Sequence, residues 1–216
     1  MELFDAIFVS LILTIAIVIF AFIRKAMRRQ TIATQIWRDF AKLKNLEEVQ
    51  GDKYSDEEAT IIAFQGTNQG MPFLLECIAT EGTPMQVGSL KLRRGEDTRI
   101  FTRMAIGIPG LPNGLRVYKE KSWSKLGKAI GMQDISTGDP EFDQAFVVKG
   151  NYEREVQDYL TSSRRMALLA QALDMQGLAL QEHGLILFRP DQIATLEELE
   201  KAFSQIGSLA TALTRS

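Results

Sequence analysis

The first hydrophobic stretch of the chain runs without a charge from Ala6 to Ile23, and only Ser10 and Thr14 in it are polar. Both hydroxyls can bond to carbonyl groups of their own helix. As a helix, these 18 residues would rise about 27 Å, close to the roughly 30 Å hydrocarbon core of a bilayer. The pattern therefore predicts a transmembrane anchor over residues 1–30, followed by one domain over residues 31–216.

Two alternatives compete with a membrane span. A cleaved signal peptide would have a basic start, whereas this one carries Glu2 and Asp5. A buried core helix with no polar face would be unusual in a soluble protein of this size. The basic residues that follow the run are Arg24, Lys25, Arg28 and Arg29. They predict an outside N-terminus and a cytoplasmic domain, at the inner membrane if the source is bacterial, and they are candidates for contact with lipid headgroups.

Beyond the anchor, the hydrophobic spacing changes to helical and then to strand-like. A helix is expected first, with one hydrophobic face docked on the domain, formed by Ile32, Ile36, Trp37, Phe40, Leu43 and Leu46. Apolar runs then predict strands at 59–65, 71–80, 98–108, 115–119, 145–149, 178–181 and 185–188. We expect the first two to form a hairpin with a five-residue loop at 66–70, and the next two to pair with each other.

Further helices are predicted at 124–130, 152–160, 164–174 and 196–213. Hairpins dominate and no regular alternation of strand and helix occurs, which indicates an α+β domain with a largely antiparallel sheet and flanking helices. The last helix has a hydrophobic stripe made of Leu196, Leu199, Phe203, Ile206, Ala210 and Leu213. This stripe packs either on the protein's own sheet, which we favour, or on a partner helix.

Composition excludes several classes of protein. The net charge of -2 gives no global reason to bind nucleic acid. One cysteine rules out an internal disulfide framework, and one histidine beside it leaves too few ligands for a structural zinc site. No phosphate-binding loop, dinucleotide fingerprint or nucleophile elbow is present in the sequence. We therefore expect neither an enzyme nor a bound cofactor.

Carboxylates are densest near Asp139, Glu141 and Asp143. Such a cluster can hold a divalent cation or act as acid and base. Asp139 directly before Pro140, however, is typical of a helix start, where the carboxylate caps free N–H groups. We favour the capping role, with Phe142 and Phe146 entering the core.

Three other features have a structural and a functional interpretation. Cys77 lies in an apolar strand and is expected to be a buried, inert thiol. His183, expected in a hairpin turn, is either an exposed incidental residue or a general base. The loop 107–114 is rich in turn residues and is either a plain connection or a contact surface formed with Ile108 and Leu111.

Basic residues also gather between Lys91 and Lys128. They include Arg93, Arg94, Arg99, Arg103, Arg116 and Lys119. These side chains form either an ordinary solvated strand face or an extension of the lipid contact. Arg93 and Arg94 are the candidates for a partner or small-anion contact.

Two segments carry a resemblance. The runs "STGDPEFDQAFVVKG" (136–150) and "YLTSSRRMALLAQ" (159–171) resemble a segment of uncharacterised, membrane-anchored bacterial proteins with a GDPxFDxxFxV motif. The hairpin "IAFQGTNQGMPF" (62–73) is similar to theirs. The resemblance covers about half of the chain. It implies a membrane-tethered domain and no catalytic residues.

Together these observations predict a single-pass membrane protein whose cytoplasmic domain binds or positions another subunit of a membrane complex. Its expected partners are the lipid bilayer and other membrane-complex subunits, not nucleic acid. The alternatives are a membrane-bound enzyme that uses the carboxylate cluster with a divalent cation, and a sensor of a small anion.

Overall fold

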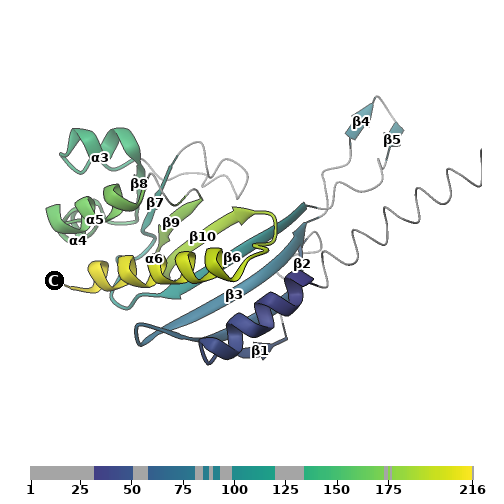
Figure 1. Cartoon of the computed structure of the whole chain (residues 1–216). Coiled ribbons are helices and arrows are strands. Elements are labelled where there is room, and N and C mark those ends of the chain that lie inside the picture. The colour runs from purple at the N-terminus through teal and green to yellow at the C-terminus, as the bar shows by residue number, and fades with distance from the viewer. Residues whose placement is uncertain are drawn as a thin grey trace, which may run out of the picture.

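The structure, a computed structural model, describes residues 32–50, 58–80, 85–87, 90–92, 99–119, 134–172, 175 and 177–215. It shows an α+β fold in which an eight-stranded antiparallel sheet is flanked by helices, as the sequence predicts (Figure 1). Several predicted features lie outside the described residues. They are the anchor at 1–30 with its four basic residues, the pair Arg93 and Arg94, and the helix expected at 124–130. Among the residues that are described, no helix is long and apolar enough to span a membrane.

The sheet brings together strands from the whole length of the domain. Its spatial order is β1-β2-β3-β6-β10-β9-β7-β8. The bounds are β1 Glu47–Val49, β2 Glu58–Asn68, β3 Met71–Thr80, β6 Arg99–Gly107, β7 Arg116–Tyr118, β8 Val147–Lys149, β9 Leu178–Gln181 and β10 Gly184–Pro190. A separate two-stranded ribbon consists of β4 Met85–Val87 and β5 Leu90–Leu92.

One face of the sheet forms the core with the helices. Along β3 and β6 the buried side chains include Phe73, Leu75, Met104 and Ile106. Because successive side chains in a strand point to opposite faces, these residues share one face. The first described helix (residues 32–43) and α6 Leu196–Thr214 cover it (Figure 1).

The N-terminal helix docks mainly through two aromatic residues. Trp37 and Phe40 are fully buried, and the indole N–H of Trp37 donates to the Ile193 carbonyl at 2.7 Å. Two members of the expected docking face are wrong, because Ile32 is 60% and Leu43 is 56% exposed, whereas Leu46 is buried as expected. The docking surface is therefore narrower than the hydrophobic spacing suggests.

Helix α6 confirms the prediction that its stripe packs on the protein's own sheet. Leu199, Ile206, Ala210 and Leu213 are buried, and the ring of Phe203 lies edge-on to Phe73 at 4.8 Å between centroids. Three shorter helices follow in the described part of the chain, before α6. They are α3 Pro140–Ala145, α4 Glu153–Tyr159 and α5 Ser162–Ala172.

The expected β2–β3 hairpin is confirmed, but its turn and one other strand pairing differ from the expectation. The β2–β3 connection is a two-residue turn at Gln69 and Gly70, both with positive φ, rather than a five-residue loop. Such a turn matches the twist of paired strands, so the ladder continues to Asn68. Strand β6 does not pair with β7: it pairs with β3 and β10, while β7 lies between β9 and β8.

Candidate functional site

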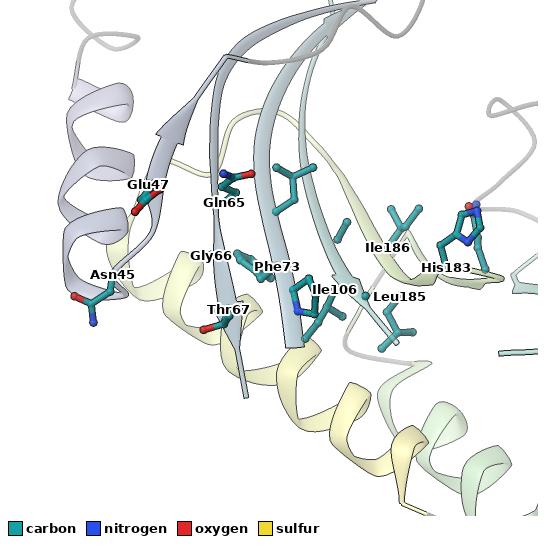
Figure 2. Close-up of a pocket in the computed structure, with 16 residues that line it drawn as sticks. Asn45, Glu47, Gln65, Gly66, Thr67, Phe73, Ile106, His183, Leu185 and Ile186 are labelled. Carbon is teal, nitrogen blue, oxygen red and sulfur yellow. The ribbon is translucent and has the colours of Figure 1, made fainter. Parts of the chain in front are cut away.

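The face of the sheet opposite the core, here called the open face, holds the candidate site. Strand register places one row of side chains across it, contributed by Glu47, Gln65, Leu74, Ala105, Ile186, Ala179 and Tyr118. Of these, Glu47 and Gln65 are exposed and Leu74, Ala105 and Ile186 are half-buried. Figure 2 shows Ile186 and its neighbour Leu185 on opposite sides of β10, with Leu185 toward the core.

Small residues hollow this face at the end of β6 and β10. Gly107 and Gly184 are directly paired across these strands, and Ala105 stands beside Ile186 in the next row of the open face. A Cβ at Gly184 would overlap the Ile106 carbonyl oxygen, so only glycine fits there. The result is a groove of about 740 Å³ between β1 and the β9–β10 turn (Figure 2).

The rim of the groove is polar and its centre is apolar. Pro72, Leu74 and Ile186 line the centre. The rim carries Asn45, Glu47, Gln65 and His183 (Figure 2), and Gln181 also lines the groove. Side-chain amides both donate and accept hydrogen bonds. This arrangement suits a ligand that is mainly apolar with hydrogen-bonding groups at its edges.

His183 lies in the β9–β10 turn, as the sequence predicts, and its side chain is 91% exposed. Its Nε2 is 3.5 Å from a carboxylate oxygen of Glu182. The other oxygen of Glu182 accepts a hydrogen bond from the Gly114 amide at 2.8 Å. Glu182 therefore holds the end of the 107–114 loop through the Gly114 amide. The exposed His183 side chain lies at the rim of the groove, not in an enclosed site.

A buried ion pair adjoins the groove on the same face. Glu76 and Arg103 are direct cross-strand partners, and Arg103 Nε donates to Glu76 Oε2 at 2.6 Å. The Glu76 side chain is 2% exposed and that of Arg103 is 17% exposed. Arg103 is thus part of the sheet's polar framework. On its other side it faces Phe188, whose ring packs on Phe101 with centroids 4.8 Å apart.

The carboxylate cluster serves the local fold. Asp139 is the N-cap of α3: it accepts from the Phe142 amide at 3.2 Å and pairs with Arg165 at 3.1 Å. The hydrogen bond from Phe142, helped by Arg165, holds the pKa of Asp139 below its ordinary value. Phe142 and Phe146 are buried, so the predicted capping role and core placement are confirmed.

Asp143 is bonded within the same segment. Its oxygens accept from the hydroxyls of Ser136 and Thr137 at 2.8 and 2.7 Å, and from the Thr137 amide at 3.0 Å. Burial raises its pKa, but these hydrogen bonds outweigh that effect and hold the pKa below its ordinary value. Glu141 is exposed. Within the described ranges, no three His, Cys, Asp or Glu side chains are grouped to hold a metal ion.

Two further expectations are confirmed. Cys77 is fully buried, and burial raises the pKa of its thiol to about 12. The thiolate, which is the reactive form, is therefore strongly disfavoured. In the 107–114 loop, Ile108 is buried and Leu111 packs against the core. This loop is a connection whose apolar residues point inward.

The groove is the feature that sequence reasoning missed. Its small residues are Ala105 and Gly107 on β6 and Gly184 on β10. These strands are far apart in the chain, and only their pairing brings the residues together. Comparison with protein-family models, with curated proteins and with solved structures finds no match. The geometry of the open face is therefore the basis for the functional argument.

Proposed function

We propose that this is a single-pass membrane protein whose cytoplasmic α+β domain binds or positions another component of a membrane protein complex. The apolar run from Ala6 to Ile23, with basic residues directly after it, supports the membrane tether. The observation that carries the binding role is the hollowed open face, which combines an apolar centre with a polar rim.

The geometry favours binding over the divalent-cation alternative. Asp139 and Asp143 accept hydrogen bonds that cap α3 and close its preceding turn. Recruiting their oxygens to a cation would break bonds that hold the local fold. A groove with an apolar centre and polar edges can accept a partner without breaking hydrogen bonds of the fold.

The experiment is purification of the tagged full-length protein from its native membranes in mild detergent, followed by mass spectrometry. An unrelated single-pass protein with the same tag, expressed at the same level, is the matched control. We expect a stoichiometric membrane-associated partner that the control does not retain. Recovery of the chain alone would overturn the binding role.

The tether is tested separately on the same membranes. A spanning segment resists extraction with alkaline carbonate, and protease added to the cytoplasmic side should digest the domain. Release by carbonate would contradict the membrane span. Digestion only from the opposite side would contradict the orientation.

A further inference from the structure

The open face has a charge pattern that runs across the strands. One end of the row is Glu47 on β1, which is exposed and has no ion-pair partner among the described residues. From there the row passes through Gln65, Leu74, Ala105, Ile186 and the buried Ala179, and it ends at Tyr118 on β7. Arg116 is two residues from Tyr118 on the same side of β7, in the neighbouring row. We name the row from Glu47 to Tyr118, together with Arg116, the transverse strip.

A basic residue, Arg116, lies beside the far end of the strip. Arg116 on β7 lies directly opposite Lys149 on β8, and like charges in that position are destabilising. Lys149 is bonded to Asp134 at 3.2 Å, whereas Arg116 pairs with no carboxylate in the part of the chain that the structure describes. A carboxylate brought from outside would relieve this repulsion.

The middle of the strip is apolar, and its length limits what can fill it. From β1 to β7 there are six strand-to-strand steps. At about 4.8 Å each they span roughly 29 Å. An extended peptide at about 3.3 Å per residue covers that distance with about nine residues. A ligand the size of a metabolite would reach only one charged end.

We propose that the transverse strip binds an extended segment, about nine residues long, of a partner protein. The segment is mainly apolar and carries a basic side chain over Glu47 and an acidic side chain over Arg116. This inference rests on the proposed binding function and names the surface and the partner's chemistry. Charge complementarity at both ends and an apolar middle are the features that select such a segment.

The test is photo-crosslinking in native membranes with the full-length chain. The photoreactive residue p-benzoylphenylalanine replaces Leu74 or Ile186 on the strip, and Met166 on α5 as an exposed control. Mass spectrometry then identifies the crosslinked peptide. We expect Leu74 and Ile186 to label one segment of another protein, with the stated charges at its two ends, and Met166 not to label it.

Charge reversal gives the second measurement. Glu47→Lys and Arg116→Glu are each expected to lower the crosslinking yield at Ile186 at least five-fold. The controls Asp158→Lys and Arg154→Glu, both on exposed positions of α4, should leave the yield unchanged.

The outcomes separate this inference from the proposed function. Crosslinks from Leu74 and Ile186 to lipid, to a second copy of the chain or to its own residues would overturn the strip. An equal loss of crosslinking yield in the control variants Asp158→Lys and Arg154→Glu would also contradict binding at the transverse strip. A co-purifying partner that crosslinks only at Met166 would contradict binding at the transverse strip but would still support the proposed function. Absence of any partner in the purification would instead overturn the proposed function.

Discussion

Asn68, the last residue of β2, lies directly against Gly207 on α6. The Asn68 side-chain amide donates to the Phe203 carbonyl at 2.7 Å, and a Cβ at position 207 would overlap the Asn68 side-chain oxygen. Asn68 is 3% exposed, so the contact is closed to water. This hydrogen bond and close contact hold the turn end of the β2–β3 hairpin against the middle of α6.

This contact predicts that Gly207→Ala is destabilising. In an exposed helix interior the same change would stabilise by about 1 kcal/mol. Here the added methyl group meets a buried side chain, and overpacking costs about 1–3 kcal/mol. The measurement is denaturant unfolding of the full-length protein in mild detergent, with exposed Ser208→Ala as the control. If Gly207→Ala were stabilising, the close packing of α6 on Asn68 would be refuted.

The Glu76–Arg103 pair predicts strong coupling between two strands. Glu76→Gln or Arg103→Met removes the charge-assisted hydrogen bond between these two buried side chains, and each is expected to lower the free energy of unfolding by about 3–5 kcal/mol. The double variant should lose less than the sum of the two, because the bond between these side chains can be lost only once. Strict additivity in this double-mutant cycle would disprove the coupling.

An exposed ion pair in the same protein provides the matched comparison. Arg38 and Glu48 lie 3.3 Å apart, with side chains 47% and 50% exposed. Glu48→Gln should cost less than about 1 kcal/mol, since solvent screens such pairs. Equal losses for the exposed and the buried pair would show that burial does not control the effect.

Burial of Cys77 predicts that its thiol is protected in the folded protein. Burial raises its pKa to about 12, and the side chain is fully enclosed. At pH 8 a water-soluble thiol reagent should therefore label it only when denaturant opens the fold. The control Ser208→Cys, on an exposed position of α6, should add one thiol that reacts at once. Rapid labelling of Cys77 in native conditions would contradict the packing of β3.

Local signals in the sequence were enough to predict most elements. Asp139 and Pro140 specify the start of α3 by themselves, since a cap depends only on its neighbours in the chain. The spacing of Leu199, Ile206 and Leu213 similarly identified the buried side of α6. Fold class followed from the order of such elements, and the structure confirms the antiparallel α+β arrangement.

Pairing partners and the groove could not be predicted in the same way. Strand β6 pairs with β10 rather than β7, and that choice depends on register between segments distant in the chain. The groove arises from Gly107 facing Gly184, which is invisible until those strands are paired. The exposure of Ile32 and Leu43 shows a related limit, because periodicity identifies a hydrophobic side of a helix but not how much of it is covered.

The carboxylates of α3 predict how the domain responds to acid. Hydrogen bonds hold the pKa values of Asp139 and Asp143 below their unfolded values, which are close to 4. A lowered pKa in the folded state contributes stability that is fully present above the unfolded pKa and is lost as the pH falls through the folded one. The free energy of unfolding should therefore decrease as the pH falls below about 4.

Asp143→Asn tests this directly. The variant should be less stable at pH 7, because a neutral amide cannot accept all the bonds from Ser136 and Thr137, and its stability should fall less steeply below pH 4. Exposed Glu141→Gln on the same helix is the control and should leave both properties unchanged. The measurement is unfolding between pH 2.5 and pH 7, roughly the range in which carboxylates titrate, with and without Mg²⁺. A stabilisation by Mg²⁺ that Asp143→Asn abolishes would reject the capping interpretation in favour of a cation site.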